Sequence, residues 1–430
     1  MNTISNKYIR FIVTIILFAP LLSYVTLGVF KKDFMTTTMI LSIFGIVLLI
    51  FFRDENNPII FPKYLLYLFL FILYITFMDF VILGKKFDAK YFYADRVVGT
   101  FYVFFLIENF KISKKYYNFI IKYSKPILVI AILVIVLQQG YNDSFLVNPY
   151  YQKVWGSIGE TENRLPSIYS YLGGGLSTGL GFVPIFIIVV EYLYKRKKNV
   201  SLWILGGFIF AFLSKYRWIM LDSLLVLFVL IANNKSKMKQ VLKYSIILPF
   251  FLIASLFALK AVGIKADKII EERILESDNN NNTTSYSTRI LAIYSFNKVF
   301  WDNPIFGVGN IKYGFGGSGK QDYKLRKLLR GHSSQLHIGY LSLLYYYGII
   351  GGVLYFCFLY FLLYKKLFKN ATKTRMYGPF LGMLCFAITN LAMVSFALLE
   401  IGLIISLVVD NYYINDYKNK LNYRNIVGKK

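Results

Sequence analysis

Candidate chemistry in this chain centres on one polar stretch, from Ala261 to Gln335, which contains His332, with His337 just beyond it. An imidazole can act as a base or donate a hydrogen bond, because its ordinary pKa lies close to neutrality. His332 is therefore a candidate for chemistry, while a helix cap that hydrogen-bonds a loop carbonyl is the structural alternative. His337 lies about 140° further round a helix. The pair therefore does not favour a shared metal ion, and His337 is expected to pack at the membrane interface.

The rest of the chain consists almost entirely of apolar segments. Hydrophobic residues make up 57% of the sequence and charged residues 17%, which excludes an ordinary soluble domain. About 20 apolar residues cross a bilayer, and spans must be helical so that every backbone polar group is satisfied. About twelve transmembrane helices are predicted by hydropathy, at residues 9–30, 34–52, 63–83, 92–108, 118–139, 168–194, 200–214, 217–232, 241–260, 346–365, 376–394 and 396–412. The predicted fold class is an all-α polytopic membrane protein, with residues 1–430 as a single integral membrane domain.

The distribution of basic residues predicts the orientation. Lys7 and Arg10 precede an apolar run that is too long for the core of a signal peptide, so the first helix is expected to remain as an anchor. With the amino terminus inside, lysines and arginines concentrate in the cytoplasmic segments. Both termini are therefore predicted to be cytoplasmic, and the large loop 261–335, between the ninth and tenth predicted helices, is predicted to be extracytoplasmic. The net charge of +27 then reflects topology and anionic lipid, and the scattered cations argue against nucleic acid as a partner.

Within the large loop, the spacing of apolar residues predicts helices and a glycine turn. Residues 264–276 are typical of an amphipathic helix near the outer surface, and residues 279–285 break it. A second helix is predicted over 287–301, ending at Asp302-Asn303-Pro304. Gly307-Val308-Gly309 then turns the chain, and a basic helix over 324–330 leads back to the bilayer.

Three short motifs follow one another along residues 170–365. They are Leu213-Ser214-Lys215-Tyr216-Arg217, then Ser287-Thr288-Arg289 with Asn303-Pro304-Ile305-Phe306-Gly307-Val308-Gly309, then Gly331-His332-Ser333-Ser334-Gln335-Leu336 with Tyr347-Gly348-Ile349-Ile350-Gly351. Together they resemble the motifs of the bacterial polysaccharide polymerase (Wzy) and O-antigen ligase superfamily. The number of spans and the single large outer loop agree with this resemblance.

The resemblance implies a GT-C-like membrane glycosyltransferase whose donor is a glycan on undecaprenyl pyrophosphate. Arg217 and Arg289 would stabilise the negative charge that develops on the departing pyrophosphate, because a guanidinium binds phosphate through two parallel hydrogen bonds. His332 would act as the base on the acceptor hydroxyl or as a donor to the pyrophosphate. No cofactor and no metal ion is implied, and the sequence contains no DxD motif.

Substrate binding is expected at five further residues, namely Asp222, Asn303, Gly307, Gly309 and Tyr169. Asp222 lies about one and a half turns deeper in its span than Arg217, where a carboxylate is costly unless it has a partner or a polar cavity. Tyr169 belongs to a group of aromatic residues that could stack on sugar rings, although interfacial anchoring explains most tyrosines without a ligand.

Several of these residues also have a purely structural interpretation. Arg217 could extend to lipid head groups, and Arg289 could simply face water on an amphipathic helix. Asp79 and Glu400 lie near other predicted outer ends, and either of them, like Asp222, could orient Arg217 or act as the base. Each could equally be a charge at an exposed helix end.

The leading functional prediction is a repeat-unit polymerase for capsule, exopolysaccharide or O-antigen, in the bacterial cytoplasmic membrane. Its partners would be an undecaprenyl-pyrophosphate-linked oligosaccharide, the lipid bilayer and other polysaccharide export proteins. A ligase that transfers a finished glycan to another acceptor is the alternative within the family. A flippase for lipid-linked oligosaccharides is the alternative from a different class, and it predicts internal repeats and charges along a central path.

Overall fold

The computed structural model describes residues 34–51, 58–84, 96–109, 285–309, 338–389 and 401–427, with Leu336, Gly206 and single positions between 92 and 137. The chain divides into two compact units, one of Met1–Leu22, Lys32–Phe119 and Ser285–Lys430, the other of Ser23–Lys31 and Ile120–Thr284. The elements described below belong to the first unit. The predicted spans at 9–30, 168–194, 200–214, 217–232 and 241–260, and nearly all of 118–139, lie outside the described residues, as does the predicted helix at 264–276.

Every regular element in the described ranges is helical, as the sequence predicts. In chain order the elements are α2 (Phe34–Phe51), α3 (Lys63–Thr76), the π-helix η2 (Phe77–Ile82), α5 (Arg96–Glu108), α13 (Ser285–Val299), the 3-10 helix η4 (Phe300–Asp302), α15 (Gly339–Tyr360), the π-helix η5 (Phe361–Phe368), α16 (Lys369–Thr374), α17 (Gly378–Thr389) and α18 (Ile401–Val427). Helices α2, α5 and α17, and α3 with η2, correspond to the predicted spans at 34–52, 92–108, 376–394 and 63–83.

Helix α3 continues into η2 as one apolar helix, Lys63–Ile82, of 20 residues. The Pro62 carbonyl accepts the Leu65 amide at 2.9 Å, which closes the first turn. One face of α3 is buried, with Tyr64, Leu65, Leu68, Phe71, Ile72 and Ile75. Other positions present exposed apolar side chains, among them Leu66, Phe69, Leu70, Leu73 and Phe77 of η2. A helix that is apolar on all sides is typical of a membrane span, and Lys63–Ile82 is long enough to cross one.

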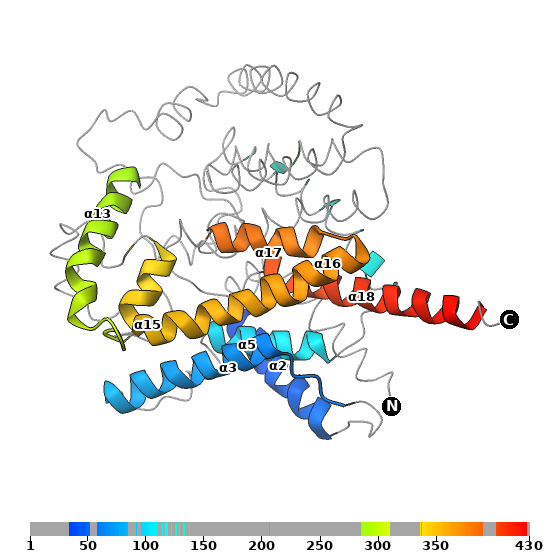
Figure 1. The fold of residues 1–430 in the computed structure, drawn as a ribbon, viewed down its shortest axis with the longest axis horizontal. Coiled ribbons are helices and arrows are strands. Elements are labelled where there is room, and N and C mark those ends of the chain that lie inside the picture. The colour runs from blue at the N-terminus through cyan, green and yellow to red at the C-terminus, as the bar shows by residue number, and fades with distance from the viewer. Residues whose placement is uncertain are drawn as a thin grey trace, which may run out of the picture. The chain divides into compact units, whose positions relative to one another are not determined.

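Helix α15 bends sharply at Gly348, whose φ of 60° and ψ of −165° are not helical. Residues on the two sides of the bend touch each other, because the Tyr340 ring lies 5.5 Å from the Phe356 ring. In a straight helix these residues would be about 24 Å apart along the axis. The bend separates a first part, 339–347, from a second part that runs on through η5 and α16 (Figure 1). The whole apolar stretch, Gly339–Thr374, has 36 residues, and the part after the bend is about 39 Å long, which suffices for one crossing.

The predicted span at 346–365 lies inside the observed helical stretch, which is longer at both ends, beginning at Gly339 and continuing to Thr374. Residues 401–412 of the last predicted span, 396–412, belong to α18, which extends as far as Val427. In both cases hydropathy located the apolar residues, but the helix continues into residues that are more polar. A helix boundary depends on backbone hydrogen bonds, and a hydropathy window does not detect them.

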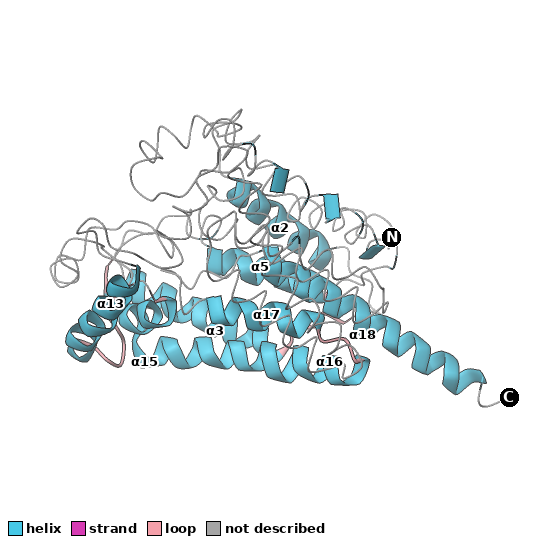
Figure 2. Cartoon of the chain, turned by 90° about the horizontal axis from the view of Figure 1, so that it is seen from above, coloured by secondary structure: helices cyan, strands magenta, loops and turns pink. Residues whose placement is uncertain are grey.

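Helix α13 confirms the second helix predicted in the large loop, and η4 ends it at Asp302, where the sequence indicates a stop. It lies beside the first part of α15 and runs across the direction of α3 (Figures 1 and 2). A cluster of buried side chains joins it to α15, consisting of Ala292, Phe296, Val299, Leu336 and Tyr345. This cluster packs α13 against the first part of α15.

Candidate functional site

The loop after α13 pairs with the bend of α15 through the backbone. Four hydrogen bonds join residues 303–309 to residues 345–350, which we call the interlock: Val308 N to Tyr345 O (3.1 Å), Gly309 N to Tyr346 O (2.7 Å), Ile349 N to Pro304 O (2.8 Å) and Ile350 N to Ile305 O (3.2 Å). Two of the three motifs singled out in the sequence therefore form one unit. The pairing satisfies backbone groups that the bend would otherwise leave without helical partners.

Three glycines make this close approach possible. Gly307, Gly309 and Gly348 have φ values of 76°, 70° and 60°, a region that residues with a Cβ rarely adopt. A Cβ added at Gly307 would lie 2.5 Å from the Gly348 nitrogen, and one added at Gly348 would lie 2.6 Å from the Gly307 nitrogen. The predicted turn at 307–309 is thus confirmed, and the two glycines are required by the backbone geometry of the interlock. Their predicted contact with substrate stays a prediction.

Tyr74 of α3 reaches the interlock from the side. Its hydroxyl lies 3.0 Å from the Phe306 carbonyl oxygen and 3.0 Å from the Tyr347 carbonyl oxygen. Tyr74 is separated from these residues by more than two hundred positions in the sequence, and nothing in its local sequence distinguishes it from the other tyrosines of the span. Tyr74 is therefore not among the site residues that the sequence predicts.

Of the residues predicted to take part in chemistry, Arg289 and Asn303 lie in the described part together with Gly307 and Gly309. Arg289 is half-buried on α13, three positions before Ala292 of the buried cluster. Asn303 is exposed at the end of η4, and its carbonyl accepts the Gly307 amide at 2.9 Å. Arg217, His332, Asp222 and Tyr169 lie outside the described residues, so their predicted roles stay predictions.

Asp79, which the sequence suggests as a possible partner for Arg217, is a buried carboxyl in η2 with only 5% of its surface exposed. It lies about one turn before Leu83, whose side chain packs against Gly309 of the interlock. A carboxylate buried in an apolar span is costly and is usually retained for a function, and π-helical turns are frequent at functional sites. Asp79 therefore joins the candidate residues near the interlock.

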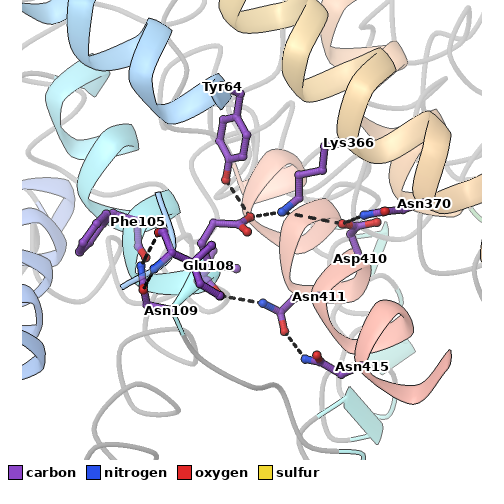
Figure 3. A network of polar contacts seen from close by, with 11 residues as sticks. Tyr64, Phe105, Glu108, Asn109, Lys366, Asn370, Asp410, Asn411 and Asn415 are labelled. Carbon is purple, nitrogen blue, oxygen red and sulfur yellow. Dashed lines mark hydrogen bonds and ion pairs between the residues drawn. The ribbon is translucent and has the colours of Figure 1, made fainter. Parts of the chain in front are cut away.

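A second polar network lies among α3, α5, η5, α16 and α18 (Figure 3). Lys366 forms an ion pair with Glu108 and lies 4.0 Å from Asp410. The Tyr64 hydroxyl donates to Glu108 at 2.7 Å, and the Asn370 amide donates to Asp410 at 2.9 Å. Glu108 and Asp410 are 8% and 3% exposed. Glu108 and Asp410 are charges at or near the ends of predicted spans, and this is the sequence signal that could have located the network, although neither residue is among the predicted site residues.

The network also joins α5 to α18 through amide groups. Asn411 donates to the Ile107 carbonyl at 2.9 Å and accepts from Asn415 at 2.8 Å. Nearby, Asn109 pairs with the backbone of Ile60 in both directions, at 2.8 and 3.1 Å. These bonds all lie at the end of α3 opposite to Tyr74, since Tyr64 stands in its first turn. The interlock and this polar network therefore lie in different places, one near each end of α3.

Comparison with models of known protein families gives a match within this region of the chain. Residues 200–356 match the sequence model of the family described as O-Antigen ligase (Wzy_C). The matched region includes α13, η4 and both segments of the interlock, and it also includes the positions of Arg217, Arg289 and His332. No curated protein matches the chain.

Proposed function

We propose, from the premise that residues 200–356 belong to the Wzy_C O-antigen ligase family, that this chain is a polysaccharide repeat-unit polymerase. The family consists of membrane enzymes that transfer lipid-linked glycans. In the proposed reaction, a glycan leaves undecaprenyl pyrophosphate and is joined to a sugar hydroxyl of a second lipid-linked glycan. The product would be capsule, exopolysaccharide or O-antigen.

The proposed reaction forms and breaks one bond at the anomeric carbon of the donor. The acceptor oxygen bonds to this carbon, the bond from the carbon to the pyrophosphate oxygen breaks, and the bonding pair leaves with undecaprenyl pyrophosphate. The acceptor hydroxyl loses its proton to a base. Arg217 and Arg289 are proposed to bind the pyrophosphate, since charge-assisted bonds to developing negative charge are among the strongest catalytic contributions.

The observation that carries this proposal is the packing of Leu336 against α13. Leu336 ends the motif that begins at Gly331, and it lies in one buried cluster with Ala292. Arg289 is three positions before Ala292, so both lie on the same side of the helix. His332 is four residues before Leu336, and four extended residues reach at most about 14 Å. The cluster thus supports a site that Arg289 and His332 share.

The proposed site lies at the outer surface of the bacterial cytoplasmic membrane. This rests on the predicted topology, in which the loop 261–335 is extracytoplasmic and both termini are cytoplasmic, with about twelve spans. The exposed aromatic and apolar side chains of Trp301, Ile305 and Phe306 support a position for η4 at the lipid boundary. Lipid-linked glycan and bilayer are the proposed partners, and other polysaccharide export proteins are proposed to act beside the chain.

Reconstitution with an undecaprenyl-pyrophosphate-linked repeat unit tests the proposal. Wild type should produce a ladder of products, and Arg289→Ala should reduce the rate by at least about 100-fold, as expected for loss of a charge-stabilising group. Lys298→Ala is the matched control, because Lys298 is an exposed cation on the same helix, 4.4 Å above the Tyr294 ring. It should retain near wild-type activity.

Three results would redirect or refute the proposal. Transfer of a preformed glycan in a single step would favour the ligase, which the family description also suggests. Movement of the lipid between leaflets with no bond formed would favour the flippase. Equal activities of Arg289→Ala and Lys298→Ala would show that Arg289 is an ordinary surface charge. The pH profile of His332→Gln distinguishes its two roles, because loss of a base removes the acidic limb of the profile.

A further inference from the structure

We propose that Tyr74 is a positioning residue for glycan transfer: its hydroxyl fastens α3 to both segments of the interlock and so holds α13 and its arginine in place. This inference rests on the proposed function, because it assigns Tyr74 a role in that reaction. Tyr74 itself is not placed in contact with substrate.

The two oxygen atoms that Tyr74 contacts occupy equivalent positions in the interlock. In one segment the carbonyls of Pro304 and Ile305 accept the cross-segment bonds, and Phe306 comes next. In the other, the carbonyls of Tyr345 and Tyr346 accept them, and Tyr347 comes next. The Tyr74 hydroxyl lies 3.0 Å from each of these next carbonyl oxygens. The single hydrogen of the hydroxyl is shared between these two carbonyl oxygens. One phenol therefore binds both segments at the residues that follow the last backbone hydrogen bonds.

The ring of Tyr74 is held against the backbone of α15 as well. A Cβ added at Gly351 would lie 3.1 Å from the Cε1 atom of Tyr74, tighter than normal contact. Gly351 is the second glycine of the motif Tyr347-Gly348-Ile349-Ile350-Gly351. A Cβ at Gly351 would lie closer still to the Cβ of Tyr347. The motif therefore combines a glycine that permits the bend with a glycine that leaves room for both Tyr347 and Tyr74.

Helix α3 gives Tyr74 a firm base. Phe71, one turn earlier, packs edge-on against Tyr347 at 6.0 Å and against Tyr355 at 5.5 Å, so that α3 contacts both sides of the bend. The first part of α15 is held a second time by Tyr340, whose hydroxyl donates to the Ala387 carbonyl of α17 at 2.7 Å. The hydroxyl groups of Tyr74 and Tyr340 thus attach the interlock and the first part of α15 to α3 and α17, and α13 leads into the interlock.

The geometry amplifies small movements of the interlock. Arg289 lies about 15 Å along α13 from Val299, where the helix ends. A rotation of only about 4° at the interlock would move the base of the Arg289 side chain by about 1 Å, and a misplacement of this size can reduce catalysis about 100-fold. We therefore expect the loss of the Tyr74 hydroxyl to act on the rate of the chemical step.

Three proteins test this inference in the reconstituted assay. Tyr74→Phe should reduce kcat by roughly 10- to 100-fold with KM within about twofold of wild type, since the effect is on orientation. Tyr67→Phe is the matched control, because it removes the same atom from the same helix at a tyrosine whose ring stacks on Phe361 at 4.9 Å. Placing 4-aminophenylalanine at position 74 restores N–H donors and should recover kcat.

Hydrogen exchange provides a readout that does not depend on activity. The amides of Val308, Gly309, Ile349 and Ile350 should exchange faster in Tyr74→Phe than in wild type or Tyr67→Phe, and the amino variant should reverse the change. Equal exchange in the two phenylalanine variants would overturn the inference. Faster exchange with unchanged kcat would overturn it too, because the Tyr74 hydroxyl would then stabilise the interlock without any effect on glycan transfer. Inactivity of wild type with every donor, in contrast, would refute the proposed function, and the positioning role with it.

Discussion

Replacement of Lys366 by methionine should destabilise the helices far more than the same replacement at Lys365. The ammonium group of Lys366 interacts with Glu108 and lies 4.0 Å from Asp410. Methionine fills much of the same space but carries no charge. The two carboxylates would then remain buried close to each other, and among the described residues the donors to them are the neutral groups of Tyr64 and Asn370.

The size of the effect follows from burial. Removing one partner of a buried ion pair costs about 3–5 kcal/mol, because the other charge stays buried and unpaired. The Lys366 side chain is 17% exposed, so water has some access to it. We therefore expect a loss near the lower end, about 3 kcal/mol, which raises the unfolded-to-folded ratio on the order of 100-fold. Lys365 is exposed and lies 5.6 Å and 5.7 Å from two tyrosine rings. Its replacement should cost less than about 1 kcal/mol.

Reversible unfolding in mixed micelles with increasing denaturing detergent gives both free energies. A third protein, Lys366→Met with Glu108→Gln, should recover part of the loss, because the second change removes the buried charge that the first leaves unpaired. Equal losses for the variants at 365 and 366, within about 0.5 kcal/mol, would refute the reasoning. So would a double variant that is less stable than Lys366→Met alone.

Two further substitutions test the interlock and the nearby carboxyl group of Asp79. Gly348→Ala should destabilise the protein far more than Gly84→Ala in the same unfolding assay. Both glycines have φ near 60°. A Cβ at 348 would collide with the interlock, 2.6 Å from the Gly307 nitrogen, whereas nothing lies within 4 Å of a Cβ at 84. The Gly84 change should cost only the conformational strain of about 1–2 kcal/mol, and similar losses would contradict the packing argument. Asp79→Asn keeps the shape of a side chain that is 5% exposed but removes its charge, so transfer should slow at least about 10-fold with normal yield of folded protein; an unchanged rate would exclude a functional carboxylate there.

Within the part of the chain that the structure describes, the sequence was sufficient to predict helices at the long apolar runs. The predicted spans at 34–52, 63–83 and 92–108 agree closely with α2, α3 with η2, and α5. A change in the direction of a helix, in contrast, could not be predicted from hydropathy. Residues 339–347 and 349–360 are apolar on both sides of Gly348, so a hydropathy profile reads them as one segment, whereas a positive φ at one glycine changes the direction of the chain.

The candidate site shows the same contrast between local and distant information. The turn at Gly307-Val308-Gly309 was predictable, because the asparagine, proline and glycines that make it are adjacent in the chain. Its pairing with residues 345–350 depends on folding over about forty residues, and its contact with Tyr74 on more than two hundred. A single sequence carries no direct signal for such pairings. The resemblance grouped the two motifs into one family pattern, and the structure supplies the physical reason that they belong together.

Helix α3 carries a phenol at each end that is engaged with another part of the protein. Tyr64 binds the carboxylate of Glu108, and Tyr74, about 15 Å further along, touches the carbonyls at the bend. A helix that is hydrogen-bonded near both ends cannot slide along its own axis without breaking the bonds at one of them. If the chain is a polymerase, as proposed, and its helices shift while the polymer grows, α3 should stay in place, and the displacement should fall on segments that are not anchored at two points.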